Sequence, residues 1–157
     1  LLVDDDAMAD ALRSGKVRRY ITDFPNPKTA NLPGCIAIPH LGASTAESED
    51  NCARMAVQQL MNYLENGNIV NSVNFPNCDM GVCATAGRIA ILHRNIPNSL
   101  SQFTMAMAGE NINIDGLMNK SRGDYAYTLL DLDHTPSDNA VAALKSVNGV
   151  IRVRVIK

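Results

Sequence analysis

The residues best suited to chemistry lie between positions 38 and 45, where a histidine and a glycine follow a short apolar run. Residues 35–38 predict a buried strand, because they are apolar and bounded by Pro-Gly before and proline after. Ser44 and Glu47 have the spacing of a capping box and predict that a helix starts there. His40 therefore follows a strand and precedes a helix, where open α/β sheets bind ligands and where histidine suits proton transfer. The alternative is a core histidine that only packs.

A second polar group, His93, Asn95 and Asn113, lies at the ends of elements expected later in the chain. His93 and Asn95 come just before the helix expected from Pro97, and Asn113 lies in the strand that follows it. Short amides beside a helix start can bind a polar ligand. The alternatives are that Asn95 is only a helix cap and that Asn113 is only an exposed strand residue.

The amino-terminal elements that must position His40 form the last part of a doubly wound α/β unit. Apolar spacing predicts a helix over 4–14 and a strand over 17–22. After the strand at 35–38, a long helix runs over 45–66, with apolar residues on one broad face. Asp23 directly follows the strand at 17–22, so it either satisfies a turn or contacts a ligand at the same edge as His40.

The carboxyl-terminal pattern changes to a compact α+β unit after an extended, asparagine-rich linker over 68–81. Alternating residues predict strands and apolar residues three or four apart predict helices. The expected elements are strands at 88–94, 112–119, 125–133 and 150–156, and helices at 97–109 and 137–147. Their order is βαββαβ, which is the ferredoxin-like arrangement.

Composition excludes several classes of function. Hydrophobic residues make up 46% of the 157 residues, which suits a globular core, and the net charge of −2 gives no basic surface for nucleic acid. No apolar run is long enough to span a membrane, and no G-x-G-x-x-G loop occurs. The four cysteines lack metal-site spacing, so no metal is expected, although Cys78 near the end of the linker and Cys83 just after it are candidate reactive thiols. Free thiols and no targeting signal point to the cytoplasm.

Three segments resemble one enzyme family in the order in which that family carries them. The run Pro39-His40-Leu41-Gly42-Ala43-Ser44-Thr45 closely resembles the catalytic-histidine segment of D-2-hydroxyacid dehydrogenases, in particular the D-3-phosphoglycerate dehydrogenases. Residues 2–7 resemble the stretch just after that family's substrate-binding arginine. Residues 93–97 resemble the start of the amino-acid-binding ACT domain that many of these enzymes carry.

The resemblance implies a fold that combines an α/β part with an α+β part. Residues 1–44 would be the carboxyl-terminal end of a Rossmann-like NAD-binding domain, and 45–67 the helix returning to the substrate domain. Residues 68–81 would be a linker, and 82–157 a ferredoxin-like ACT regulatory domain. The glycine-rich loop and the substrate arginine would precede residue 1, so the chain would be part of a longer enzyme and inactive alone.

The resemblance also implies a reaction and a regulator. The complete enzyme would transfer a hydride between NAD and 3-phosphoglycerate in serine biosynthesis, and L-serine would regulate it through a homo-oligomer formed by the ACT domain. His40 would be the acid/base, and Asp23, Gly42 and Ala43 would contact the nicotinamide end of the cofactor. His93, Asn95 and Asn113 would bind the effector.

Two positions depart from the family pattern. The family places a glutamate that binds the catalytic histidine five residues after the aspartate, but this chain has Lys28 there and no acid between Asp23 and Glu47. Asn98 replaces a glycine, which asparagine can do where a positive φ is required. Two other interpretations stay open: a stand-alone amino-acid-binding ACT module, and another D-2-hydroxyacid dehydrogenase.

Overall fold

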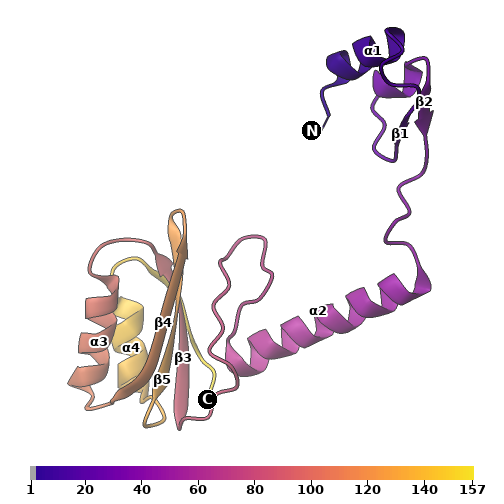
Figure 1. Ribbon diagram of the computed structural model, residues 1–157. Helices are drawn as coiled ribbons and strands as arrows, with labels where there is room; N and C mark the ends of the chain where they lie inside the picture. The colour runs from indigo at the N-terminus through magenta and orange to yellow at the C-terminus, as the bar shows by residue number, and fades with distance from the viewer. Residues whose placement is uncertain (1–2) are drawn as a thin grey trace. The chain divides into compact units, whose positions relative to one another are not determined.

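The computed structural model describes residues 3–157 and divides into two compact units, one ending at Ala53 and one running from Arg54 to Lys157 (Figure 1). Leu1 and Leu2, which include the start of the segment at 2–7, lie outside the described residues. Each unit is described by itself.

The first unit contains one helix and two short parallel strands. Helix α1 (Asp5–Arg13) begins where the Asp4 carboxylate accepts hydrogen bonds from the backbone N–H groups of Asp6 and Ala7. Strands β1 (Tyr20–Thr22) and β2 (Cys35–Ala37) pair in parallel, and the single turn η1 (Thr29–Asn31) lies between them in sequence. The strand expected from residue 17 begins only at 20, because the backbone N–H of Val17 bonds to Ala11 and extends the end of the helix.

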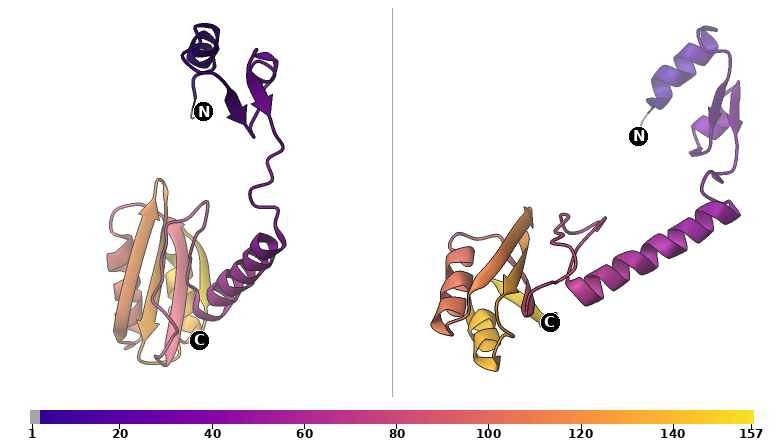
Figure 2. Two further views of the ribbon diagram at one scale, coloured as in Figure 1. Left: turned by 45° about the vertical axis from the view of Figure 1, so that its right-hand side comes forward. Right: turned by 60° about the horizontal axis from the view of Figure 1, so that its bottom comes forward.

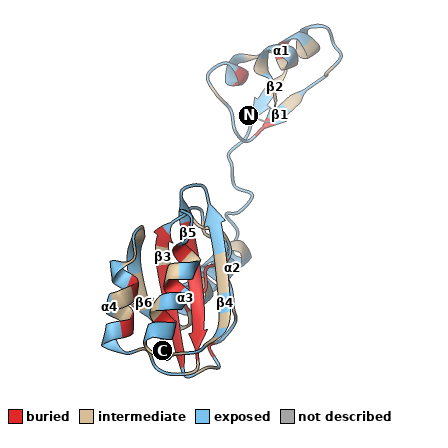
Figure 3. Ribbon diagram, turned by 90° about the vertical axis from the view of Figure 1, so that its left-hand side faces the viewer, coloured by how far each residue is buried: buried red, intermediate tan, exposed pale blue. Residues whose placement is uncertain are grey.

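Residues 35–37 form the expected strand β2, but the expectation that this strand is buried is wrong. Ile36 and Ile38 expose 45% and 46% of their surface, and Ile21 on the neighbouring strand exposes 60%. The physical reason is that the described sheet has only two strands, too few to bury their apolar side chains, and Figure 3 draws most of β2 in the pale blue of exposed residues. Parallel strands are normally covered on both faces. This sheet differs, because its apolar side chains are exposed.

Helix α2 (Ala46–Asn66) crosses the boundary between the units. Its start is capped by Thr45, whose hydroxyl accepts from the backbone N–H of Ser48 at 3.2 Å, and not by Ser44 as expected. The expected apolar face is present, but none of its residues is buried, and Leu60 exposes 61% of its surface. Within residues 3–157, no helix combines the length and apolar character needed to cross a membrane.

The second unit has the expected βαββαβ order. Its strands and helices are β3 (Gly87–Arg94), α3 (Ser99–Gly109), β4 (Ile114–Arg122), β5 (Tyr125–Leu132), α4 (Asp138–Ser146) and β6 (Val150–Val155). The four strands pair antiparallel in the order β4-β5-β3-β6, and α3 and α4 lie together on one face of the sheet (Figures 1 and 2). This is the ferredoxin-like topology.

Alternation along β3 divides its side chains between two apolar clusters. Ile89 and Ile91 are fully buried against α3 and α4, in a cluster that includes Phe103 and Leu144. Ala90 points to the other face of the sheet. There it packs in a second cluster with Ile69, Cys78, Tyr127 and Leu129. Residues 68–81 have little regular structure, as the sequence indicates, but this cluster shows that part of them packs onto the sheet.

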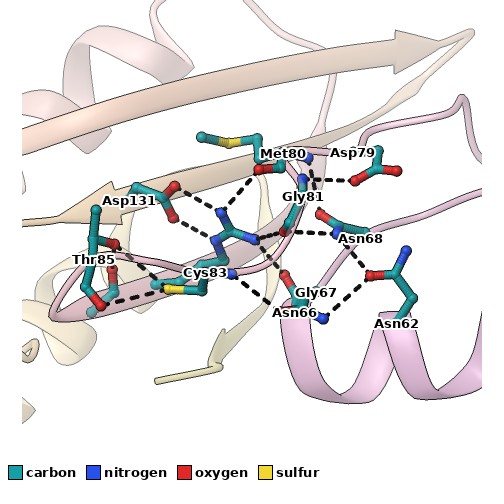
Figure 4. Close-up of polar contacts among 12 residues, drawn as sticks. Asn62, Asn66, Gly67, Asn68, Asp79, Met80, Gly81, Cys83, Thr85 and Asp131 are labelled. Carbon is teal, nitrogen blue, oxygen red and sulfur yellow. Dashed lines mark hydrogen bonds and ion pairs between the residues drawn. The ribbon is translucent and has the colours of Figure 1, made fainter.

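A buried arginine, Arg88, connects the end of α2 to the sheet, and Figure 4 labels its partners Asn66, Gly81 and Asp131. The Arg88 guanidinium on β3 is fully buried and donates to both carboxylate oxygens of Asp131 on β5, with Nη2 2.7 Å from Oδ2. Its Nη1 also donates to the carbonyl oxygens of Asn66 at 3.1 Å and Gly81 at 2.7 Å. The hydrogen bond to Asp131 is the main reason that the pKa of Arg88 is raised.

Candidate functional site

His40 and Asp23 lie side by side in the first unit. Thr22 at the end of β1 pairs with Ala37 at the end of β2, and the backbone N–H of Ile38 continues this ladder to the Thr22 carbonyl at 3.0 Å. Because the strands are parallel, the residues that follow them emerge at one edge. His40 Nδ1 lies 2.8 Å from Asp23 Oδ2, and both side chains are about half exposed.

The imidazole also has an aromatic neighbour. The Phe24 ring meets the His40 ring edge-on, with centroids 4.5 Å apart. Lys28, which takes the place of the family's glutamate, forms an ion pair with Asp6 instead. This hydrogen bond lowers the pKa of Asp6 and raises the pKa of Lys28. The carboxylate beside the histidine is thus Asp23, a residue that the family resemblance places at the cofactor.

The turn after His40 is open. Gly42 and Ala43 are exposed, and a Cβ atom added to Gly42 would meet nothing within 4 Å. The turn therefore leaves space for a ligand beside the Asp23 carboxylate and the His40 ring. Among residues 3–157, no cluster of three or more metal-ligating side chains occurs.

A second site is a polar pocket of about 260 Å³ at the start of α3. It is lined by His93 and Asn95 together with residues of the α3 start and of β4. Asn98 adopts φ +67°, a left-handed conformation, so the explanation for asparagine replacing glycine there is confirmed. The Asn95 amide donates to the Gly123 carbonyl oxygen at 3.1 Å and connects this pocket to the β4–β5 turn.

His93 is 2% exposed and both of its ring nitrogens have partners within the fold. Nδ1 lies 2.8 Å from the carbonyl oxygen of Arg94, and Nε2 lies 2.9 Å from Thr128 Oγ1. The Thr128 hydroxyl in turn donates to Asn119 Oδ1 at 2.8 Å. Phe103 packs edge-on against the imidazole. His93 is therefore held inside the core and does not direct a free nitrogen into the pocket.

Asn113 is not part of this pocket. It precedes β4, where Ile114 pairs with Leu132, whereas His93 pairs with Ala126 near the other end of β5. Its side chain donates to Asp115 at 3.1 Å. The structure thus brings His93 and Asn95 together and leaves Asn113 at the opposite end of the sheet.

Sequence reasoning missed Asn119, which lines the pocket, and Thr128, a fully buried residue that joins Asn119 to His93. The available signal was weak: Thr128 is one small polar residue between Tyr127 and Leu129. Cys78, a candidate reactive thiol, is fully buried, and burial raises its pKa to about 11. Its position in the core therefore contradicts a reactive role, because the reactive species is the thiolate.

Comparison with known proteins shows similarity along almost the entire chain. A D-3-phosphoglycerate dehydrogenase of Haemophilus influenzae is 29% identical over 166 residues, covering 99% of this chain and 40% of that protein. The enzyme of the same name from Escherichia coli K12 is 27% identical, covering 99% of this chain and 41% of that protein. The Dictyostelium discoideum enzyme is 26% identical over 95% of this chain. The chain spans about two fifths of the length of these relatives.

Other comparisons add less. No protein-family model matches the chain. The crystal structure of the ACT domain from the GTP pyrophosphokinase of Chlorobium tepidum aligns with 45% of this chain at a TM-score of 0.39 and 18% identity. A TM-score this low supports no conclusion about the fold beyond the strand order already described.

Proposed function

Because the chain is homologous over nearly its whole length to part of the D-3-phosphoglycerate dehydrogenases, we propose that it belongs to an NAD-dependent enzyme that oxidises 3-phosphoglycerate. The observation that carries the proposal is the position of His40 beside a carboxylate at the carboxyl end of two parallel strands. The uncovered apolar residues of β1 and β2 support a larger nucleotide-binding domain, in which further strands would extend this sheet and helices would cover its faces.

In this proposal, His40 moves the substrate's hydroxyl proton. Oxidation of a 2-hydroxy acid removes a hydride from the α-carbon and a proton from the hydroxyl group, so a base must lie beside that oxygen. With Nδ1 donating to Asp23, neutral His40 keeps Nε2 unprotonated and able to accept the proton. In the reverse direction the imidazolium returns the proton to the developing alkoxide.

Asp23 would then be a positioning residue that fixes the tautomer and the ring plane of His40. Phe24 would restrict rotation of the same ring. Asp23 would thereby take the role of the family's glutamate, whose position Lys28 occupies here. Its second oxygen could still accept a hydrogen bond from the carboxamide of a bound nicotinamide.

NAD would supply the hydride acceptor at this edge of the sheet. Gly42 and Ala43 would line its nicotinamide end with backbone, because neither side chain extends across the open turn. Asp23 and His40 would lie between that surface and the substrate.

The four cysteines are free, which supports a reducing compartment such as the cytoplasm.

The test of this proposal uses the longer enzyme that contains the chain. His40→Ala should lower kcat for 3-phosphoglycerate by roughly 10²–10⁴-fold, the usual contribution of a general acid/base. The matched control is His134→Ala, which removes an exposed histidine of the second unit and should leave turnover within a few-fold. Turnover of His40→Ala equal to that of the control would refute the assignment.

A double-mutant experiment distinguishes the two roles of Asp23. If it acts through His40, Asp23→Asn lowers kcat in the wild type but has little further effect on kcat in His40→Ala, because residues that act as a unit are not additive. If it contacts the carboxamide, Asp23→Asn raises KM for NAD in both backgrounds. A change in cofactor KM alone would remove the positioning role.

For the second unit we propose regulation by L-serine bound between two copies of the chain. His93 and Asn95 border one pocket and Asn113 lies at the opposite end of the sheet, so a ligand in this pocket reaches Asn113 only if a second copy supplies it. A two-fold arrangement would form two such sites. The two equilibria are then linked: dimerisation raises the affinity for serine by a certain factor, and serine must raise the dimerisation constant by the same factor.

Calorimetry and sedimentation at several protein concentrations test this regulation. Asn113→Ala should abolish serine-enhanced dimerisation, whereas Asn111→Ala, an exposed nearby change in the α3–β4 loop, serves as a folded control. Asn111 has φ +56°, so Asn111→Gly is a second control without the strain expected of alanine. A dimer that binds no serine at millimolar concentration would overturn the proposal.

A further inference from the structure

The pocket at the start of α3 is bordered by a chain of hydrogen bonds whose direction is constrained by its fixed end. The backbone oxygen of Arg94 can only accept, so His93 Nδ1, 2.8 Å away, must carry a proton. Nε2 and Thr128 Oγ1 are 2.9 Å apart, and Thr128 Oγ1 and the Asn119 amide are 2.8 Å apart. The proton state of Nε2 therefore decides how the remaining two bonds run.

When His93 is neutral, its single proton is on Nδ1 and Nε2 must accept. The Thr128 hydroxyl then donates to Nε2 and has no proton left for Asn119. An amide oxygen next to Thr128 would face an acceptor, so the Asn119 amide must place its NH₂ there and donate. Its oxygen is then the end that lines the pocket.

When His93 is protonated, the chain reverses. Nε2 now donates to Thr128, and the Thr128 hydroxyl is released to donate to the Asn119 oxygen, which is the arrangement of this structure. The amide has turned by half a rotation, and its NH₂ group lines the pocket instead. The two ends of a carboxamide have nearly the same size, so this rotation needs no repacking.

We propose that Asn119 is a ligand-contacting residue of this pocket and that the protonation of His93, relayed by Thr128, selects which end of its amide faces the ligand. The neutral state offers a carbonyl oxygen and selects a ligand with an N–H donor, such as an α-ammonium group. The protonated state offers an NH₂ group and selects an acceptor such as a carboxylate. The ligand class rests on the proposed amino-acid regulation, but the relay does not.

The side chains that pack around His93 are uncharged, so its polar contacts are those of the relay and of the Arg94 carbonyl oxygen. The imidazole packs against Phe103 of α3, with ring centroids 4.9 Å apart, and its strand partners are Ala126 on β5 and Val150 on β6. None of these carries a charge. The neighbouring Arg94 side chain lies over the Tyr125 ring at 4.5 Å. Within residues 3–157, no carboxylate forms an ion pair with His93.

The experiment is a nuclear magnetic resonance titration of the 157-residue chain without ligand. The ring nitrogens of His93 and the side-chain NH₂ of Asn119 are followed as the pH is lowered. We expect the Nδ1-protonated tautomer at high pH and an Asn119 NH₂ shift that changes with the same midpoint as the His93 ring. Thr128→Val keeps the shape of Thr128 but removes the hydroxyl, so the Asn119 signal should stop following His93.

Three results would overturn the relay: an Asn119 NH₂ signal that stays constant while His93 titrates, an Nε2-protonated neutral ring, or a His93 that stays neutral until the chain unfolds. Asn95→Ala is the matched control, because it removes another amide of the pocket and should leave the coupling intact. Serine is absent from this measurement, so loss of serine binding would refute the proposed regulation without affecting the relay.

Discussion

Removing the charge of Asp131 should destabilise the second unit more than any surface substitution. Asp131→Asn keeps the shape of the side chain but leaves the fully buried Arg88 guanidinium without its anion. Loss of one partner of a buried ion pair costs about 3–5 kcal/mol. We expect the lower part of that range, about 3 kcal/mol, because Arg88 would still donate to the carbonyl oxygens of Asn66 and Gly81.

The assay is urea unfolding followed through the ring signals of His93 and His134, since both histidines belong to the second unit. The two units need not unfold together, so a probe within one of them is required. A domain typically has 5–15 kcal/mol of stability, so a loss of about 3 kcal/mol shifts the midpoint measurably. Asp115→Asn is the matched control, because Asp115 is exposed on the adjacent strand.

The reasoning is refuted if Asp131→Asn costs less than about 1 kcal/mol, the usual limit for exposed ion pairs. A second variant separates the charge from the packing. Replacing both partners, as in Arg88→Met with Asp131→Leu, should cost less than Asp131→Asn alone, because no unpaired charge remains in the core.

Three further results are expected. Gly87→Ala should lower the free energy of unfolding by about 1–3 kcal/mol, because its Cβ would lie 2.5 Å from the His134 carbonyl oxygen. Gly109→Ala, where a Cβ meets nothing within 4 Å, should not lower it, and equal melting curves of the two variants would contradict this reasoning. At pH 8 a thiol reagent should modify the exposed Cys52 before Cys78, whose pKa of about 11 keeps it protonated, and mass spectrometry of the modified peptides would reveal the opposite order. Asn98→Ala should cost about 1–2 kcal/mol relative to Asn98→Gly, because alanine disfavours φ +67°, and urea midpoints measure the difference.

The local elements could be predicted from the sequence because their determinants are local. Alternation in residues 88–94 and apolar spacing in 137–147 identified the strands and helices of the second unit, and their order gave its topology. Asp4 and Ser137 cap their helices through contacts two or three residues away. The position of His40 after a strand followed from the prolines and glycines around it.

The partners of buried polar groups could not be predicted in this way, because they come from distant positions. Arg88 meets Asp131 across 43 positions and the Asn66 carbonyl across 22, so no spacing rule connects them. Asp23 reaches His40 only because a parallel pairing aligns the ends of two strands. His93 acquires Thr128 and Asn119 because antiparallel pairing places three strands in one register. The sequence by itself determined which residues can carry protons and charges, and the tertiary structure decided which of them share a hydrogen bond.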